Sequence, residues 1–195
     1  DAPMNEDKAI VLDFLPQGKS SGFKSEPIAI VLGMGFFTLL EVVPKVGVDL
    51  KPLEEVYIGK DSREKIDHIK QRIPYEQLTS VAKSELERAV DQAIMLNEAR
   101  FVSFFNISGS ISLKRHQLEL LPGVGRRHLG DILKERQAKP FDSLKDVENR
   151  IRFLTSPLSI LRRRIMSELE GDEKHFLFVR PPQVEDLERK ARYPR

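Results

Sequence analysis

A chain of 195 residues that is 40% hydrophobic and 32% charged is typical of a soluble folded protein, and its length favours two small domains over one. It lacks the apolar run of roughly 18 residues that a membrane span needs, and the absence of cysteine excludes disulfides and favours a reducing, cytoplasmic location. The net charge of +2 conceals a basic segment, since residues 111–164 hold 13 Lys and Arg against 6 Asp and Glu, which favours a polyanionic partner there.

Residues 1–74 are expected to form a five-stranded β-barrel. Short apolar runs alternate there with turns such as Gly33-Met34-Gly35, since glycine tolerates positive φ and proline cannot continue a strand ladder. The run Ile28-Ala29-Ile30-Val31-Leu32 is apolar on both faces, which favours a closed or partly closed small barrel over a half-solvated sheet. The expected strands are Lys8–Phe14, Pro27–Gly33, Phe36–Val43, Glu55–Gly59 and Lys65–Ile73.

Residues 75–110 are expected to form a linking segment made mainly of one long amphipathic helix. The hydrophobic spacing changes here from two residues to about 3.6, which predicts a helix over about residues 79–106. Thr79 or Ser80 can cap its start, and Gly109 lies just beyond its end. Its aromatic residues are interpreted as core rather than as a ligand platform: Phe101, Phe104 and Phe105.

Residues 111–170 are expected to form a compact helical domain, because short amphipathic stretches follow one another with turn residues between them. Ser156-Pro157 is a typical helix start, and Phe141–Leu169 could be a degenerate second copy of the first helical pair. Residues 171–195 are expected to hold a strand over His175–Val179 that returns to the barrel, and then a poorly ordered charged tail. The expected helices are 112–121, 125–138, 143–152 and 157–170.

The most specific motif is Leu121-Pro122-Gly123-Val124-Gly125, between the first two of these helices. Proline ends the first helix, the two glycines permit a tight reversal, and Val124 points inward to hold the turn. The backbone amides of the turn and of the next helix then face outward, where the helix dipole favours an anion such as a phosphate. Arg126 and Arg127 follow directly and add positive charge.

This motif resembles the helix-hairpin-helix family of nucleic-acid binders, over about residues 114–136. The resemblance implies contact with the phosphate backbone and little sequence preference, although some members use the motif only for packing or protein contacts. Leu129 stands where the family usually has a small residue, so the two helices are expected to lie slightly farther apart. The residues expected to bind nucleic acid are Lys114, Arg115, Pro122, Gly123, Val124, Gly125, Arg126, Arg127 and His128.

A secondary basic surface is a further prediction, drawn from five residues outside the motif. Acidic residues such as Asp61, Glu64 and Asp67 interleave its first part, so an ordinary solvated surface is the favoured interpretation there. Consecutive helical residues turn by about 100°, so Arg162, Arg163 and Arg164 cannot all share one face, and at most two of them can join a single basic surface. The residues concerned are Lys60, Arg63, Lys65, Arg162 and Arg163.

No catalytic constellation is visible, so we expect a protein that is not an enzyme and that uses no metal and no cofactor. Gly18-Lys19-Ser20 lacks the earlier glycine and the following helix that a phosphate-binding loop requires. The four histidines show no metal-ligand spacing, and Asp67-His68 has no candidate nucleophile to activate. A nuclease is the least favoured alternative.

Five strings spread over most of the chain match one further family: Val11–Gly18, Tyr57–Lys60, Arg63–His68, His116–Gly123 and Glu170–Glu173. They resemble an uncharacterised archaeal family, a domain of unknown function described as predicted nucleotide- or RNA-binding. The resemblance implies an archaeal origin, an OB-like barrel followed by a helix-hairpin-helix domain, and RNA slightly in preference to DNA.

We therefore expect an α+β protein: an N-terminal OB-like five-stranded β-barrel, a long linking helix and a C-terminal helix-hairpin-helix domain. Its expected partner is RNA or DNA, bound through phosphates, with no membrane contact. A protein-interaction adaptor of the translation or DNA repair machinery is the alternative, and the oligomeric state stays open.

Overall fold

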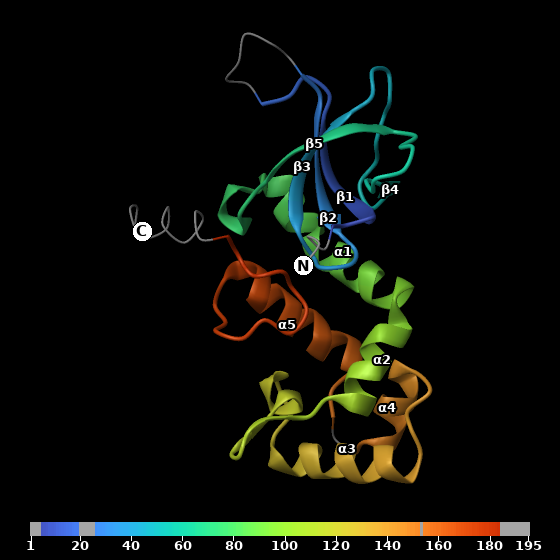
Figure 1. Cartoon of the computed structure of the whole chain (residues 1–195), viewed down its shortest axis with the longest axis vertical. Helices are drawn as coiled ribbons and strands as arrows, with labels where there is room; N and C mark the ends of the chain where they lie inside the picture. Colours follow the sequence, from blue (N-terminus) through green and yellow to red (C-terminus); the bar gives the residue numbers. More distant parts are fainter. Residues whose placement is uncertain (1–4, 20–25, 153, 184–195) are drawn as a thin grey trace. The chain divides into compact units, whose positions relative to one another are not determined.

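The computed structural model describes residues 5–19, 26–152 and 154–183 (Figure 1). The chain divides into two compact units, which are treated separately below. Unit 1 comprises the described residues within Asp1–Val90 and Ser167–Arg195, and unit 2 comprises those within Asp91–Met166. The expected charged tail from residue 184 onward, and Phe153 of the expected second copy, lie outside the described residues.

Unit 1 is built on a five-stranded antiparallel sheet in the order β4-β1-β2-β3-β5. The pairing skips Leu12 in β1 and both Asp67 and Lys70 in β5, and these bulges bend the two strands and curl the sheet. No ladder joins β4 to β5 within the described residues, so the sheet is a half-barrel, and the five expected strands are all present. The strands are β1 Lys8–Leu15, β2 Ile28–Gly33, β3 Leu39–Pro44, β4 Glu55–Tyr57 and β5 Ile66–Arg72.

Both faces of the central strands are buried. Val11, Val31 and Val42 belong to one cluster of buried side chains, from three adjacent strands. The intervening Ile10 and Ile30 are fully buried as well. Burying an aliphatic side chain of this size stabilises a protein by about 1.5–3 kcal/mol, so the apolar strands explain why this sheet forms.

The turn between β2 and β3 is held by the buried carboxylate of Glu6. The N–H of Gly35 donates to Oε2 at 2.8 Å, and the N–H of Phe36 donates to Oε1 at 2.8 Å. The hydroxyl of Thr38 also donates to Oε1, at 3.0 Å. A Cβ at Gly33 would lie 2.1 Å from Cδ of Glu6, so glycine leaves the space that the carboxylate occupies. The turn expected at Gly33 is therefore confirmed.

The helix expected over residues 79–106 is in fact two helices, α1 Ser80–Leu96 and α2 Glu98–Ile107. Asn97 separates them with φ −122° and ψ 35°, outside the helical range. Asparagine is a weak helix former because its side chain competes for nearby backbone groups. The interpretation of the aromatic residues as core agrees with the full burial of two of them: Phe101 and Phe105.

The segment after α2 is a β-hairpin, so the helix expected over residues 112–121 is wrong. Strands β6 Ser110–Ser112 and β7 Arg115–His116 pair antiparallel, and a 3-10 helix, η2 Gln117–Leu120, follows. Serine favours non-helical backbone and alternates here with Ile111, a pattern that suits an extended strand.

The three later helices lie where the sequence predicts them: α3 Arg126–Ala138, α4 Leu144–Arg150 and α5 Pro157–Glu170. Helices α1 and α5 each contain one of the boundaries between the units. No helix in the described part of the chain is both long and apolar enough to cross a membrane. The buried residues of unit 2 include Phe101, Phe105, Leu118, Leu121, Ile132, Val147, Ile160, Leu161 and Ile165.

The strand expected over His175–Val179 is not formed. Oε1 of the buried Glu168, near the end of α5, instead accepts three backbone N–H groups, those of Leu177, Phe178 and Val179, each at 3.0 Å. The Glu168 carboxylate thus accepts hydrogen bonds from N–H groups that would pair with a neighbouring strand if this segment were a β-strand. The backbone N–H of Arg180 then donates to the carbonyl oxygen of Phe36 at 2.9 Å, which attaches this segment to the rest of unit 1.

Candidate nucleic-acid interface

The turn between η2 and α3 has the features that the Leu-Pro-Gly-Val-Gly string predicts. Gly123 has φ +82°, a left-handed conformation that L-residues with a side chain rarely adopt. The side chain of Val124 is buried, and its N–H donates to the carbonyl oxygen of Leu121 at 3.2 Å. Gly125 is the N-cap of α3. The chain therefore reverses sharply at Gly123 and starts α3 immediately afterwards.

Helix α3 starts without the groups that usually stabilise a helix N-terminus. Its N-cap, Gly125, has no side chain that could accept a hydrogen bond, and its first turn contains no acidic residue. The first intrahelical bond runs from the N–H of Leu129 to the carbonyl oxygen of Gly125, at 2.9 Å. Arg126 and Arg127 occupy the first turn, where the positive end of the helix dipole disfavours cations.

Helix α4 shows the contrasting arrangement within the same unit. The Ser143 hydroxyl accepts the N–H of Asp146 at 2.9 Å, and Asp146 adds a carboxylate to the first turn. A side-chain cap of this kind contributes about 1 kcal/mol. Unit 2 therefore caps the start of α4 with a side chain, whereas the start of α3 has no side-chain cap.

Gly125 is not required by the internal packing. Its φ of −92° is accessible to any residue, and a Cβ there would meet no atom within 4 Å. Neither backbone strain nor crowding therefore requires glycine here. Without a side chain at this position, the backbone amides at the start of α3 stay accessible. This open space is what a phosphate oxygen needs in order to approach them.

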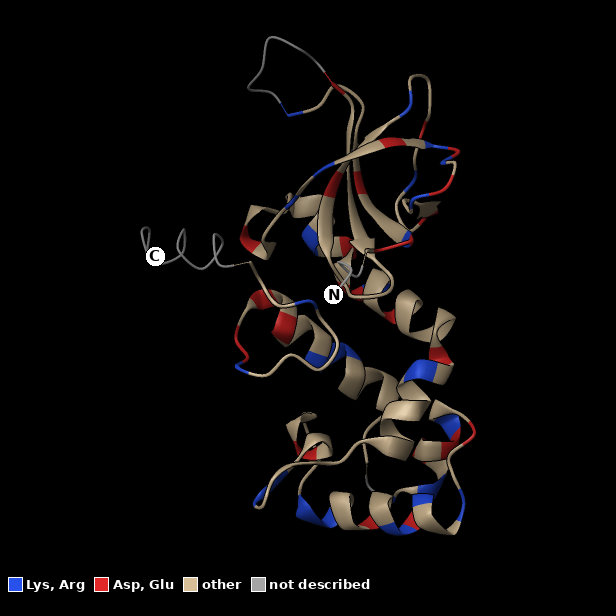
Figure 2. Cartoon of the chain, in the orientation of Figure 1, with Lys and Arg blue, Asp and Glu red and all other residues tan. Residues whose placement is uncertain are grey.

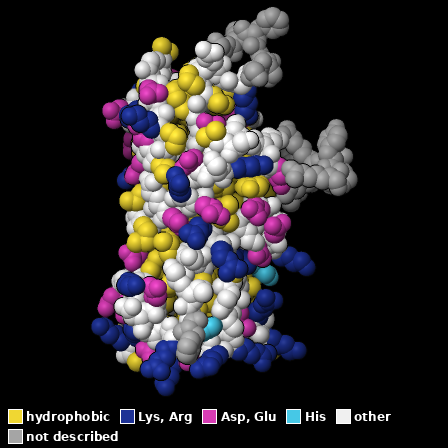
Figure 3. Space-filling view, turned by 180° about the vertical axis from the view of Figure 1, so that it is seen from behind, with side chains coloured by type: hydrophobic (Ala, Val, Ile, Leu, Met, Phe, Trp, Pro, Cys, Tyr) yellow, Lys and Arg dark blue, Asp and Glu magenta, His cyan; other side chains and the backbone are white. Residues whose placement is uncertain are grey.

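Several of the predicted basic residues lie on the surface near this turn. Arg126 and Arg127 are exposed, as are Lys114 and Arg115 on the β6–β7 hairpin, whereas His128 is half-buried. Figure 2 marks the Lys and Arg positions of the hairpin and of the α3 start in blue on the ribbon, and Figure 3 shows Lys and Arg side chains gathered over this part of unit 2 from the opposite side.

Five further exposed cations of unit 2 were not selected from the sequence: Arg100, Lys134, Lys139, Lys145 and Arg152. Lys134 lies seven residues after Arg127, which is two helical turns, so the two side chains share one face of α3. That spacing was the signal that could have identified Lys134. Asp131 also lies on this face, one turn after Arg127, and reduces its positive potential.

Other basic residues of unit 2 serve its own structure. Arg164 is buried and donates to the carbonyl oxygen of Leu120 at 3.1 Å. Arg150 donates to the carbonyl oxygens of Glu135 and Lys139, both at 2.7 Å. The excess of 13 basic over 6 acidic residues therefore overstates the charge that a partner could meet.

The predicted secondary basic surface is divided between the units. In unit 1, Lys60 is exposed, whereas the Arg63 Nε donates to the Gly59 carbonyl oxygen at 2.8 Å and Lys65 pairs with Glu54 at 3.2 Å. In unit 2, Arg163 is exposed and Arg162 pairs with Asp91 at 2.7 Å. Three of the five residues are thus engaged by neighbours of their own unit.

His116, expected inside a helix, is instead the buried N-cap of η2. Its Nδ1 accepts the N–H of Leu118 at 3.1 Å, while its own N–H donates to Glu119 Oε1 at 3.0 Å. Only the neutral ring can accept at Nδ1. Burial lowers the pKa of His116 below its usual value, the Arg136 cation lowers it further, and the Glu119 carboxylate opposes both effects.

A pH-dependent loss of stability is expected from His116. Because the pKa of His116 is lower in the folded state, the unfolded chain takes up the proton first as pH falls. The stabilisation of the folded state by neutral His116 is therefore fully present above about pH 6.5 and is lost at lower pH. His116→Asn keeps a capping acceptor without a titrating group and should flatten urea unfolding midpoints between about pH 7 and pH 5. His68→Asn removes an exposed histidine as the control; an equally steep decline in both variants would contradict this role.

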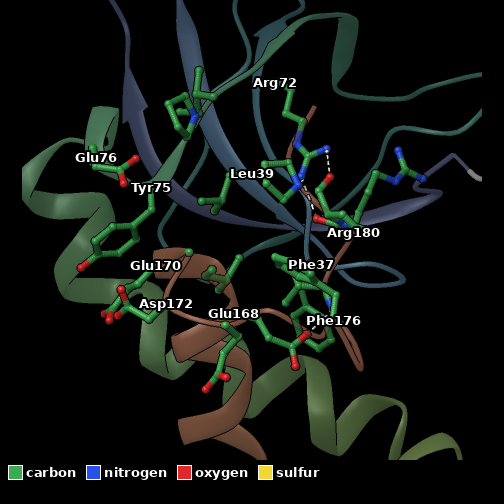
Figure 4. A pocket seen from close by; sticks show the side chains of 18 of the residues that line it. Phe37, Leu39, Arg72, Tyr75, Glu76, Glu168, Glu170, Asp172, Phe176 and Arg180 are labelled. Atoms are coloured by element: carbon green, nitrogen blue, oxygen red, sulfur yellow. Dashed lines mark hydrogen bonds between the residues drawn. The ribbon is translucent and has the colours of Figure 1, made fainter. Parts of the chain in front are cut away.

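Unit 1 contains a cleft of ≈ 1490 Å³ beside the C-terminal segment, lined in part by the 3-10 helix η1 Tyr75–Gln77 (Figure 4). Burial raises the pKa of the Tyr75 hydroxyl, and the Glu170, Glu76 and Glu87 carboxylates raise it further. Burial also raises the pKa of Glu170, with Asp172 and Glu87 adding to the effect. This wall of the cleft is therefore electronegative.

One cation of the opposite side of the cleft is used within the protein itself. The Arg72 guanidinium there donates to the backbone oxygens of Arg180, at 2.8 Å, and Pro181, at 2.9 Å, and so is used to hold the chain. The lining also includes Lys83, Lys174 and Arg180, so basic and acidic side chains are mixed around the cleft. Within the described residues, no group of three or more acidic or histidine side chains is arranged to hold a metal ion.

Comparison with known proteins places the chain among archaeal relatives. It is 46% identical over 177 residues to "Uncharacterized protein MJ0038" of Methanocaldococcus jannaschii, covering 90% of this chain and 80% of that protein. The crystal structure of Af1531 from Archaeoglobus fulgidus matches with a TM-score of 0.82 and 39% identity, over 90% of this chain and all of that one. The model of a protein family of unknown function, DUF655, matches residues 5–180. The chain is a member of the DUF655 family, as the matching strings in its sequence predict.

Proposed function

We propose that the chain binds nucleic acid through the phosphate backbone, with RNA in slight preference to DNA and with little sequence specificity. A phosphate would accept hydrogen bonds from the amides at the α3 start, while Arg126 and Arg127 supply positive charge. Lys114 and Arg115 of the hairpin would contact neighbouring phosphates.

One observation carries this proposal: the start of α3 combines a glycine N-cap, no acidic residue and two arginines in its first turn. Each of these choices forgoes helix stability in the absence of an anion, because the N-cap supplies no side-chain acceptor and the cations oppose the dipole. A bound phosphate would reverse all three costs together.

In this proposal the fold is a variation of the helix-hairpin-helix. The single 3-10 turn η2 takes the place of the first helix, and α3 is the second. The helices α4 and α5 would be a degenerate second copy of the helix-hairpin-helix motif. The half-barrel of unit 1 would be a partly open relative of the OB-fold.

The salt dependence of binding tests this proposal. If Lys114, Arg115, Arg126 and Arg127 each neutralise one phosphate of duplex DNA, the logarithm of the binding constant should fall against the logarithm of salt concentration with a slope of about −3 to −4. Fluorescence anisotropy with labelled duplex and single-stranded RNA and DNA measures this slope.

Charge reversal locates the contacts. The double variant Arg126→Glu, Arg127→Glu should reduce the magnitude of the slope by about two. Lys51→Glu with Arg88→Glu makes the same change in net charge on exposed residues of unit 1 and should leave the slope unchanged. Binding that does not respond to salt would contradict the proposal and favour the protein-interaction role.

A further inference from the structure

The β6–β7 hairpin presents an aliphatic side chain at its tip. Leu113 and Lys114 form the two-residue turn between Ser112 and Arg115, and Leu113 is fully exposed, at 107%. Single exposed leucines are common on proteins, so exposure alone means little. What distinguishes Leu113 is its place at the tip of a hairpin, directly followed by two exposed cations.

The base of this hairpin is firmly held. Gly109 and Gln117 exchange two hydrogen bonds at 2.9 Å, from the Gly109 N–H to Gln117 Oε1 and from the Gln117 N–H to the Gly109 carbonyl oxygen. Arg136 of α3 donates to the carbonyl oxygen of Ser108 at 2.8 Å and to that of Phe105 at 3.3 Å. The hairpin is therefore connected through its base to the same helix whose start carries Arg126 and Arg127.

We infer that this hairpin is a wedge: Leu113 inserts between stacked bases of a nucleic-acid duplex, while Lys114 and Arg115 contact the flanking phosphates. This inference rests on the proposed function. Duplex-binding proteins commonly insert an aliphatic side chain at a base step, with cations nearby to hold the backbone. A rigid base matters because a flexible tip would lose entropy on insertion.

A duplex fits this surface better than a single strand does. Single strands are held mainly by aromatic side chains that stack on bases. In unit 2, Phe101, Phe105 and Phe141 are buried in the core and Phe104 is half-buried, whereas the exposed apolar side chains of the hairpin are aliphatic, Leu113 and Ile111. The partner is thus a duplex of RNA or DNA, which the experiment distinguishes by using both.

The experiment uses RNA and DNA duplexes with 2-aminopurine at a central position, because this base fluoresces more strongly when it is unstacked. The chain contains no tryptophan, which keeps its own emission low. Saturating wild-type protein should raise the fluorescence of the preferred duplex. Leu113→Ser should abolish the rise and weaken binding by roughly tenfold, with the salt slope unchanged because no charge is removed.

Val46→Ser is the matched control. Val46 is also a fully exposed aliphatic residue at a turn and is adjacent to a lysine, but it lies in unit 1. It should leave both readouts unchanged. Salt-dependent binding without a fluorescence rise, or a rise that persists in Leu113→Ser, would overturn the wedge and leave phosphate binding intact. Absence of salt-dependent binding by the wild type would overturn both.

Discussion

Replacing Gly125 with aspartate is expected to stabilise the protein and to prevent it from binding nucleic acid. The new carboxylate would accept hydrogen bonds from the amides of the first turn of α3 and would lie beside Arg126 and Arg127. It would therefore occupy the position that we assign to a phosphate. A Cβ at Gly125 meets no atom within 4 Å, so the substitution fits without strain.

The expected gain in unfolding free energy is about 0.5–1 kcal/mol, from the cap and from the interaction with the helix dipole. The affinity for nucleic acid should fall by at least about tenfold, because a charge-assisted contact is replaced by repulsion. Urea unfolding and fluorescence anisotropy measure the two effects on the same preparation.

Gly125→Asn separates the cap from the charge. Asparagine caps a helix about as well as aspartate does but adds no negative charge. It should therefore give part of the stabilisation with a smaller loss of binding than aspartate. Unaltered affinity in Gly125→Asp would exclude the start of α3 as the phosphate site.

Replacing Glu168 with alanine should destabilise unit 1 by about 3 kcal/mol or more, because it leaves three backbone donors without their acceptor. The N–H groups of Leu177, Phe178 and Val179 all depend on this one oxygen. Chemical denaturation measures the loss, and hydrogen exchange of these amides should accelerate in the native state.

Glu170→Gln on the same helix is the control for Glu168→Ala. The raised pKa of Glu170 shows that its surroundings disfavour a negative charge, so removing that charge should leave stability unchanged or slightly increased. Equal losses in the two variants would mean that any acidic residue near the end of α5 matters equally, contrary to the hydrogen bonds of Glu168.

The sequence predicts those parts of the fold whose causes are local. The strands follow from apolar runs between turn residues, and Gly123 was identified because only glycine readily adopts its left-handed φ. Helix α3 starts at Arg126, directly after the glycine expected to end the turn. The exposed arginines of its first turn also follow directly from the motif.

The errors have causes that lie far away in the chain. His175–Val179 has the pattern of a strand, but its donors are taken by Glu168, and sequence periodicity does not reveal that partner. Arg150 and Arg164 count as surface charge in the sequence, whereas backbone oxygens of distant residues bind them. The hairpin at residues 110–116 has a local cause instead, because Ser110 and Ser112 favour extended backbone over the expected helix.

The division of the chain also sets an order of events during synthesis. Unit 1 requires residues on both sides of unit 2, because Glu168 and the segment that it holds come from beyond residue 166. At about 5–20 residues per second, the ribosome needs roughly 4–15 s to pass from residue 90 to residue 167. All residues of unit 2 therefore emerge before the last part of unit 1, so the half-barrel is synthesised first but lacks the segment held by Glu168 until the basic unit has left the ribosome.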